Sequence, residues 1–331
     1  MVRTFDVVGI GNAIVDVIAH ADEAFLARED LVKGTMALID AARAEALYHR
    51  MGPAVETSGG SAGNTMAGLA SLGGRGAYIG KVRDDLLGAV FRHDITALGV
   101  SFATPAAAAG PDTARCLILV TPDGQRTMNT YLGACVELGP DDIDRVTVAA
   151  AQITYLEGYL FDPPQAQAAF RKAAAIAHAA GRKVALSLSD PFCVARHRAA
   201  FRDLVAREVD ILFANEAEIC ALCETEDFAA AAAAVREQVA VAALTRSEKG
   251  SLVIAGGAEH RVAAAPVARV VDTTGAGDLY ASGFLCGLTR ALALPMCGQL
   301  GSLCAAEIIS HMGGRPETEL RGLAIAAGLP L

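Results

Sequence analysis

The residues best suited to chemistry stand in one short segment, "DTTGAGD" at 272–278, where two carboxylates bracket small residues. A strand-like stretch, "ARVVD", leads into it, and a helical stretch, "LYASGFLCGLTRAL", follows. At a helix start the N–H groups of Gly275, Ala276 and Gly277 would be unobstructed, and the helix dipole favours an anion there. Asp278 lies next to this anion site as a candidate general base. The segment thus predicts attack of a hydroxyl group on the γ-phosphate of ATP.

The competing interpretation of 272–278 is a glycine-rich turn with two solvated aspartates. Other phosphate-binding patterns are missing, since the chain has no G-x-x-x-x-G-K-[ST], no H-R-D and no D-F-G. "GIGNAI", after the first apolar run, lacks the last glycine of G-x-G-x-x-G. A dinucleotide-dependent dehydrogenase is therefore the weakest alternative.

Strand-like apolar runs alternate with helical stretches along most of the chain. This alternation predicts an α/β fold with a mostly parallel central sheet flanked by helices, and ligands at the carboxyl ends of its strands. The predicted strands are residues 5–11, 75–82, 151–159, 183–190, 209–216 and 241–247.

Two stretches break this rhythm and predict a small β-sheet lid over the site. Residues 16–40 and a second insertion at about 100–133 read as short strands joined by turns, with the second pair of strands at 113–133. "TPDGQR" is a hairpin signal between apolar runs. We expect a single α/β domain over residues 1–331 that carries this lid.

Composition narrows the class of partner. The 331 residues carry a net charge of −9, which disfavours nucleic acid and anionic membrane surfaces. No apolar run approaches the ~18–20 residues of a membrane span, and no cleavable signal peptide is recognisable. We expect a cytoplasmic protein that acts on a small molecule.

With these residues stated, a family resemblance can be given. "DTTGAGD" resembles the carboxyl-terminal signature of the ribokinase-like (PfkB) carbohydrate and nucleoside kinases, and "SGGSAGNTMAGLASLG" at 58–73 resembles their amino-terminal signature. "KGTMALID", "YLEGYLFDPP" and "EIISHMGGRP" resemble the bacterial adenosine kinases within that family. The resemblance covers essentially the whole chain and implies a ribokinase-like fold, ATP, Mg²⁺ and K⁺.

The resemblance also implies an acceptor site. Asn12 and Asp16 would hold two ribose hydroxyls, although Asp16 could instead belong to an ordinary strand-end turn. Gly59 and Gly60 would let backbone approach the sugar, and Asn64 would offer a donor and an acceptor. The lid and wall candidates, of which Met36 and Tyr159 could instead be core residues, are Met36, Thr130, Tyr131, Glu157 and Tyr159.

For the nucleotide, the resemblance implies binding by Asn215, Thr245, Ser247, Gly250, Gly277 and His311. Ser247 stands where relatives have a glycine, and His311 could instead be a helix-end histidine. Glu218 would hold Mg²⁺ through water, because Mg²⁺ gives up its hydration reluctantly, while Glu216 is expected to be solvated. Asp272 and Thr274, with carbonyl groups from 305–315, would form a monovalent-cation site.

The leading hypothesis is an ATP-dependent kinase that phosphorylates the 5′-hydroxyl of adenosine, with Asp278 as the base. A kinase of the same mechanism acting on ribose, fructose or a similar sugar is the alternative. A nucleoside-binding regulator without catalysis is the third hypothesis, and the intact 272–278 segment and Glu218 speak against it. Either a monomer or a homodimer is compatible with the sequence.

Overall fold

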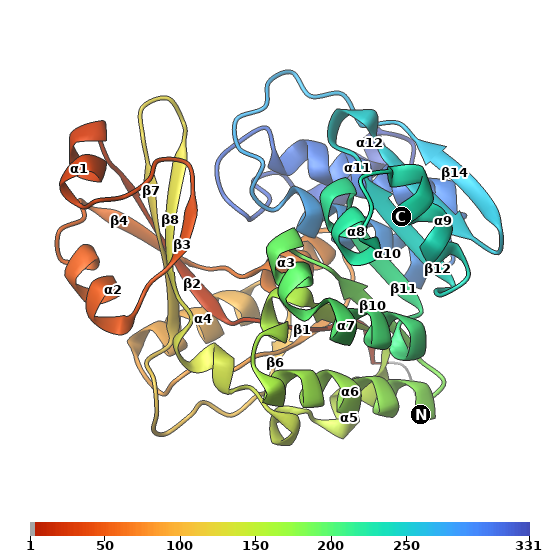
Figure 1. Ribbon diagram of the computed structural model, residues 1–331, viewed down its shortest axis with the longest axis horizontal. Coiled ribbons are helices and arrows are strands. Elements are labelled where there is room, and N and C mark those ends of the chain that lie inside the picture. The colour runs from red at the N-terminus through yellow and green to blue at the C-terminus, as the bar shows by residue number, and fades with distance from the viewer. Residues whose placement is uncertain (1–3) are drawn as a thin grey trace.

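Two β-sheets of unequal size organise the protein, whose computed structural model describes residues 4–331 (Figure 1). The larger sheet has nine strands in the order β14-β13-β12-β11-β10-β9-β1-β5-β6. Its strands are β1 (Phe5–Ile10), β5 (Gly76–Ile79), β6 (Ser101–Phe102), β9 (Ala151–Glu157), β10 (Lys183–Ser187), β11 (Ile211–Asn215), β12 (Val241–Thr245), β13 (Ser251–Ala255) and β14 (Ala258–Val262).

The strands from β6 to β12 are parallel, which confirms the predicted sheet. They are apolar on both faces because helices cover both; Val7 and Val8, neighbours in β1, are both fully buried but pack into different core clusters. The antiparallel hairpin β13–β14 extends one edge. The turn of this hairpin contains two glycines, at 256–257, which are a turn signal. The hairpin was not predicted from the sequence.

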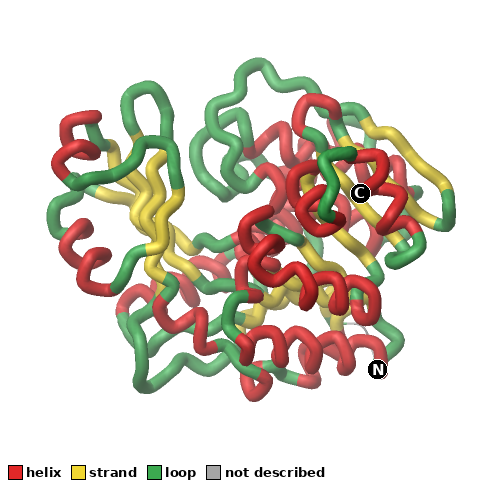
Figure 2. The backbone as a smooth tube through the Cα atoms, in the orientation of Figure 1, coloured by secondary structure: helices red, strands yellow, loops and turns green. Residues whose placement is uncertain are grey.

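Helices form a layer on each face of the large sheet (Figures 1 and 2). One layer contains α5 (Arg145–Ala150), α6 (Pro164–Ala179), α7 (Pro191–Glu208), α8 (Glu216–Cys223) and α9 (Phe228–Arg236). The other contains α3 (Ser61–Ser71), α4 (Leu86–Ala97), α10 (Ala276–Thr289), α11 (Leu294–Ile308) and α12 (Leu320–Ala326). Within the described residues, no helix has the length and apolar character to cross a membrane.

The smaller sheet stands apart from the helical layers, at the left of Figure 1. Its strand order is β3-β8-β7-β2-β4, built from β2 (Ile14–His20), β3 (Met36–Leu38), β4 (Ala54–Ser58), β7 (Ala114–Val120) and β8 (Arg126–Tyr131). Helices α1 (Glu23–Arg28) and α2 (Ala41–Tyr48) accompany it. We call this sheet with its two helices the lid. It confirms the small second sheet expected from the two insertions.

The lid extends further than the sequence indicated in one insertion and less far in the other. Strand β4 pairs with β2, so the first lid segment continues beyond residue 40 to Ser58. "AVETS" has no strong strand pattern because it is an edge strand with much of its surface in contact with solvent. Strand β6, within the predicted second insertion, belongs instead to the large sheet.

The strand expected in "ARVVD" before Asp272 is wrong. Residues 263–275 contain no strand, and the chain reaches α10 through an irregular segment. Val271 N–H bonds to the carbonyl of Ile309 at the end of α11 rather than to a neighbouring strand. The helix predicted after the segment is confirmed as α10.

The start of α3 is fixed by a backbone conformation that suits only glycine. Gly60, the residue before α3, has φ 82° and ψ 143°. A Cβ atom added to Gly60 would overlap the carbonyl oxygen of Asn12, so the end of β1 and the start of α3 lie in direct contact. The "GG" at 59–60 therefore brings the first sheet and the amino-terminal signature together.

We expect Gly60→Ala to destabilise the protein by more than the backbone strain alone. Gly99→Ala is the matched control, because Gly99 has φ 83° but no atom of the described chain lies within 4 Å of its added Cβ. The control should cost about 1–2 kcal/mol, and the Asn12 overlap should add to this in Gly60→Ala. Chemical denaturation of the two variants measures the difference, and equal losses would contradict the close approach.

Candidate active site

Asp278 lies in the first turn of α10 and faces the first turn of α3. Its carboxylate accepts hydrogen bonds from Ser61 Oγ at 2.5 Å and Asn64 Nδ2 at 3.0 Å. Burial raises the pKa of Asp278, while these two hydrogen bonds and the charge of Arg315 oppose the rise. The two sequence signatures, more than 200 residues apart, are thus joined by direct bonds to the predicted base.

The backbone before Asp278 forms the predicted turn. Gly275 caps α10 with φ 78°, a left-handed conformation that favours glycine. Ala276 N–H is already used by the carbonyl of Thr273 at 3.2 Å, whereas within residues 4–331 the N–H groups of Gly275 and Gly277 have no partner. A Cβ atom on Gly277 would meet none of the described atoms within 4 Å, so the space before α10 is open. The geometry is that of an anion site with two free amides.

Asp16 approaches the same site from lid strand β2. Gly59 leaves no room for a side chain, because an added Cβ would overlap the carboxylate of Asp16. Burial raises the pKa of Asp16 to about 6, opposed by the charges of Arg315 and Arg126 and reinforced by Asp278. The acceptor candidate on the lid and the base on the main sheet are therefore close enough to interact electrostatically.

Glu157 lies beneath these groups at the end of β9 and is almost fully buried. One carboxylate oxygen accepts from the side chain and the backbone of Asn12, at 2.8 and 3.3 Å, and the other accepts from Ala62 N–H at 2.7 Å. Burial raises the pKa of Glu157 to about 7, against these hydrogen bonds. The structure thus places Asn12 and Glu157 in one buried hydrogen-bonded unit that joins β1, β9 and α3.

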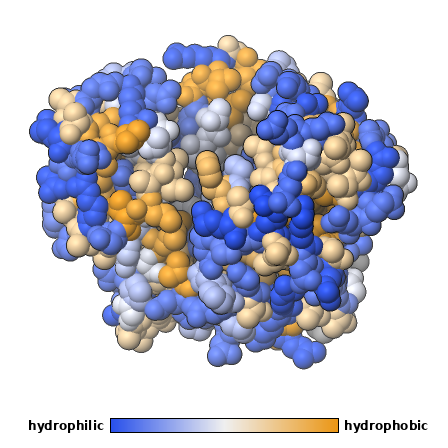
Figure 3. Space-filling model, in the orientation of Figure 1, coloured by the Kyte–Doolittle hydropathy of each residue, from blue (hydrophilic) through white to orange (hydrophobic). Residues whose placement is uncertain are grey.

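The lid has one face toward the site and one face toward its own helices. Residues alternate along each strand, so Ile14 and Ile18 share the inner face with Asp16, whereas Val15 and Val17 pack toward α2. Met36, which is 46% exposed, pairs with Met128 on this inner face. The other apolar residues of the inner face are Cys116, Ile118 and Val120, and Met312 of the main domain packs against them. Figure 3 shows hydrophobic residues on the lid beside a hollow that separates it from the main domain.

Two of the predicted lid and wall residues, Tyr131 and Tyr159, do not lie on the inner face of the lid. Tyr131 lies on the outer face of the lid opposite Arg115, whose guanidinium carbon is 5.8 Å from the ring centre. The structure therefore does not bring Tyr131 together with Asp16. Thr130, its neighbour, faces inward and donates to Cys116 Sγ. Tyr159 follows β9, is 40% exposed, and has its pKa raised by burial and by several carboxylates that include Asp278.

Asn215 and Glu218 close the site at the start of α8. They form a reciprocal cap, in which Asn215 Oδ1 accepts from Glu218 N–H at 2.9 Å and Glu218 accepts from Asn215 Nδ2 and N–H. Burial raises the pKa of Glu218 to about 7, reinforced by the charges of Asp190 and Asp278. Glu216, expected to be solvated, instead accepts from Arg246 at 2.7 Å.

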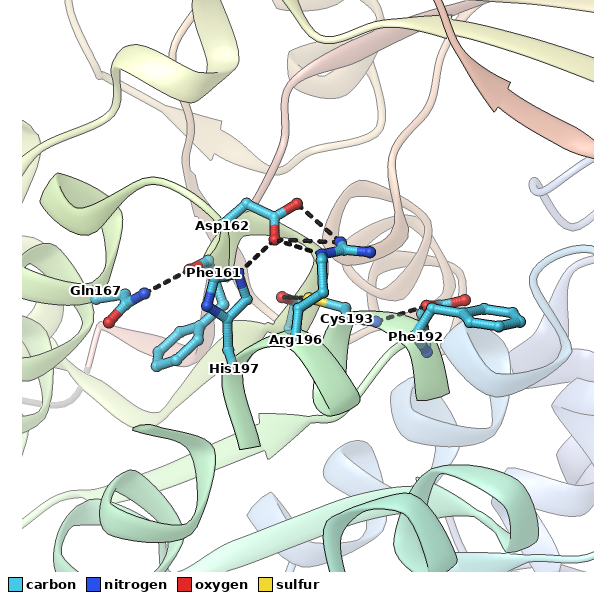
Figure 4. Close-up of polar contacts among 9 residues, drawn as sticks. Phe161, Asp162, Gln167, Phe192, Cys193, Arg196 and His197 are labelled. Atoms are coloured by element: carbon cyan, nitrogen blue, oxygen red, sulfur yellow. Dashed lines mark hydrogen bonds and ion pairs between the residues drawn. The ribbon is translucent and has the colours of Figure 1, made fainter. Parts of the chain in front are cut away.

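Asp190, which adds negative charge near Glu218, lies at the start of α7, and a cluster of polar contacts around Asp162 follows at the kink of this helix (Figure 4). Asp190 caps α7 through the N–H groups of Phe192 and Cys193. Further along α7, His197 has non-helical backbone angles and marks the kink. Asp162 lies 2.6 Å from His197 Nε2 and accepts a hydrogen bond from Arg196 at 3.0 Å. The carboxylate of Asp190 is therefore held by the cap on the first turn of α7.

The remaining nucleotide candidates lie beyond the end of β12, after Thr245. Ser247 has φ 51°, so it adopts the left-handed conformation that favours glycine. Gly250 has φ 80°, and an added Cβ would overlap the carbonyl of Val262. His311 lies 3.1 Å from Glu307 and is mostly buried at the end of α11, the geometry of a helix-end histidine.

Asp272, a candidate residue for a monovalent cation, lies next to a cation of the protein itself. Asp272 Oδ1 accepts from Thr274 N–H at 3.0 Å, and Oδ2 accepts from Gly313 N–H at 3.2 Å. Arg126 of the lid adds an ion pair, with its Nε 2.9 Å from Oδ2 and both side chains at most 7% exposed. A guanidinium thus already supplies the positive charge that K⁺ would bring to this carboxylate.

Comparison with known proteins gives the family. The profile of the pfkB family carbohydrate kinases matches residues 29–320. The chain belongs to this family. Adenosine kinase from Saccharomyces cerevisiae is 28% identical, over 94% of this chain and 96% of its own.

Two solved structures are similar to this chain in both sequence and fold. Adenosine kinase from Sinorhizobium meliloti is 56% identical, with a TM-score of 0.91, over 98% of this chain and 99% of its own. A probable sugar kinase protein from Rhizobium etli is 52% identical, with a TM-score of 0.93, over all of both chains. The fold is therefore ribokinase-like, and the protein is an ATP-dependent kinase with an alcohol acceptor.

Three residues of this pfkB site were not predicted: Arg126, Asp190 and Arg315. Arg126 is the last residue of the hairpin signal "TPDGQR", and Asp190 ends a predicted strand before a proline, a signal for a helix cap. Arg315 belongs to "HMGGRP", a stretch that carries the family resemblance but predicts no role for the arginine. None could be assigned to the site without knowing which segments the fold brings together.

We expect Asp272→Asn to cost about 3–5 kcal/mol of stability, because Arg126 would remain buried without its partner. Replacing both residues, as in R126M/D272N, should recover much of this loss. Asp203→Asn is the control, since Asp203 and Arg171 form an ion pair with side chains 38% and 40% exposed, and it should cost at most about 1 kcal/mol. Denaturant unfolding of the wild type, Arg126→Met, Asp272→Asn and the double variant gives the coupling energy; additive losses would contradict the buried pair.

Proposed function

We propose that this kinase transfers the γ-phosphoryl group of ATP to the 5′-hydroxyl of adenosine. The observation that carries the proposal is the inner face of the lid, where Asp16 is surrounded by apolar side chains. A carboxylate suits ribose hydroxyls, and the apolar surface beyond it suits a flat base. A free sugar would leave Ile18, Ile118 and Met128 facing a polar ligand. The similarity to the Sinorhizobium meliloti adenosine kinase supports the same acceptor.

In this proposal Asp16 orients the acceptor from the lid, together with Asn12, Met36, Gly59 and Gly60. Asn64 binds the acceptor next to the base. Its Nδ2 donates to Asp278, while its Oδ1 is buried and has no hydrogen-bond partner within residues 4–331, so it is available to the acceptor. Asp278 takes the proton of the attacking hydroxyl. The amides of Gly275 and Gly277 receive charge that develops on the transferred group.

The described residues fit ATP and Mg²⁺. Arg126 has a buried Nη2 without a hydrogen-bond partner in the described chain, next to the anion site. Glu218, Asp190 and Asp278 place carboxylates within electrostatic range of one another, and a divalent cation would relieve their repulsion. Mg²⁺, when bound, would neutralise charge on the phosphates. We propose that Glu218 holds it through water, and that Asn215, Thr245, Ser247, Gly250 and the 311 region contact the nucleotide.

The second candidate is a sugar kinase with the same mechanism. The Rhizobium etli relative, described as a probable sugar kinase, favours it at 52% identity. All residues assigned to phosphoryl transfer would keep their roles.

Coupled detection of ADP release over a panel of acceptors tests the function. Adenosine should give a higher kcat/KM than ribose, fructose and 2′-deoxyadenosine. The 2′-deoxy compound should lose roughly 1–3 kcal/mol of binding, because it leaves polar groups of the site unpaired. Faster phosphorylation of a free sugar than of adenosine would establish the second candidate instead.

We expect Asp278→Asn to lower kcat by ~10²–10⁴-fold, since the amide keeps the shape but cannot accept the proton. Adenosine affinity, measured by calorimetry, should change little because Asp16 is untouched. Asp203→Asn serves as the control for a surface carboxylate. Near-native kcat in Asp278→Asn would place the base elsewhere.

A further inference from the structure

Arg315 is a partly buried cation whose donors all go to neutral groups. Its Nε donates to the carbonyl of Ser58 at 2.9 Å, Nη2 donates to Ser58 Oγ at 3.0 Å, and Nη1 donates to the carbonyl of Gly63. Within residues 4–331, no carboxylate forms an ion pair with it at 4.0 Å or less. Arg315 is therefore held in place by backbone and hydroxyl groups and not by a counter-ion.

The groups that hold Arg315 are the segment that carries the site. Ser58 ends lid strand β4 and precedes Gly59, which contacts Asp16. Gly63 lies in the first turn of α3, between the two residues that hydrogen-bond to Asp278. A Cβ on Gly63 would lie 3.4 Å from Nη2, so the guanidinium packs tightly against this turn.

Three carboxylates interact electrostatically with the guanidinium without forming an ion pair with it: those of Asp16, Asp94 and Asp278. A charge that is partly removed from water and has no direct partner is costly. Attraction to these carboxylates, which are also only partly exposed, offsets part of that cost.

We propose that Arg315 is a positioning residue of the phosphoryl transfer, whose single charge keeps Asp16 and Asp278 ionised together. The inference rests on the proposed function of these two carboxylates. Asp16 must be charged to accept hydrogen bonds from both acceptor hydroxyls, and Asp278 must be charged to take a proton. Arg315 serves both because it is anchored on the segment from Ser58 to Gly63, which contacts Asp16 through Gly59 and holds Asp278 through Ser61.

The electrostatics of the two carboxylates agree with this role. Burial raises the pKa of Asp16 and of Asp278. The charge of Arg315 opposes this rise at both carboxyls. Most of the other titratable groups facing Asp278 are acidic, so they cannot replace Arg315. Besides Arg315, the groups that interact with Asp278 are Asp16, Tyr155, Glu157, Tyr159 and Glu218.

The test is the pH profile of kcat/KM for Arg315→Gln and Arg315→Lys. Loss of the charge should move the acid limb upward by about one pH unit, because a neighbouring charge typically shifts a carboxyl pKa by 1–3 units. Arg315→Gln should then be about tenfold slower near pH 6 and should recover at high pH. Arg315→Lys keeps the charge without the fork and should stay close to the wild-type profile.

Arg92→Gln is the matched control. Arg92 also donates to two backbone carbonyls, those of Phe102 and Thr104, at 2.8 and 2.7 Å, but it lies in α4 away from Asp278. Its profile should not shift along the pH axis. A pH-independent loss in Arg315→Gln would show a purely structural role and overturn the proposal, as would an unchanged profile.

A second readout does not depend on the acceptor. Carboxyls with a raised folded-state pKa bind more protons when folded, so stability falls as pH rises through that pKa. In Arg315→Gln this fall should shift to higher pH in melting curves, and adding Asp278→Asn should remove the part of the shift that Asp278 contributes. A melting profile that is unshifted would contradict the inference. If adenosine is not the acceptor, the proposed function fails while both readouts, measured with the true acceptor, still decide on Arg315.

Discussion

The buried carboxylate of Glu157 is the constraint on which the rest of the site depends. It collects N–H groups from Asn12 and Ala62, and so ties the carboxyl end of β1, the end of β9 and the start of α3 to one point. Gly11 has no side chain because an added Cβ would overlap this carboxylate. Without a partner for each oxygen, a carboxyl group at this depth would be strongly destabilising. The three elements must therefore meet where they do.

Everything else in the site is positioned relative to that point. Once α3 begins at Ser61, Ser61 and Asn64 face α10 and fix Asp278. The chain leaves the large sheet after β1 to enter the lid and returns through Gly59 and Gly60, which brings Asp16 back over the base. The lid contacts the main domain again through the Arg126–Asp272 pair and through Met312. The candidate acceptor, base and anion groups are thus placed by a few polar contacts between segments remote in sequence.

The sequence was sufficient for the parts that rest on local pattern. The parallel strands, the helix at 276–289 and the small second sheet follow from periodicity and turn signals, and the kinase family follows from two motifs. Strand β4 was missed because an edge strand needs no apolar alternation, and the strand before Asp272 was wrong because apolar residues there serve an irregular segment. Arg126 and Arg315 could not be assigned, since their partners lie more than 140 residues away. Tyr131 faces away from the site because a strand residue one position off lies on the opposite face.

The lid separates two tasks that many enzymes combine in one wall. Asp16 and the apolar inner face belong to the small sheet, whereas Asp278, the glycine turn and Glu218 belong to the large one. Substitutions on the inner face of the lid can therefore change which alcohol is accepted and leave the phosphoryl-transfer groups undisturbed. A family built in this way can diversify its substrates by small sequence drift in five short strands, with the reaction itself inherited intact.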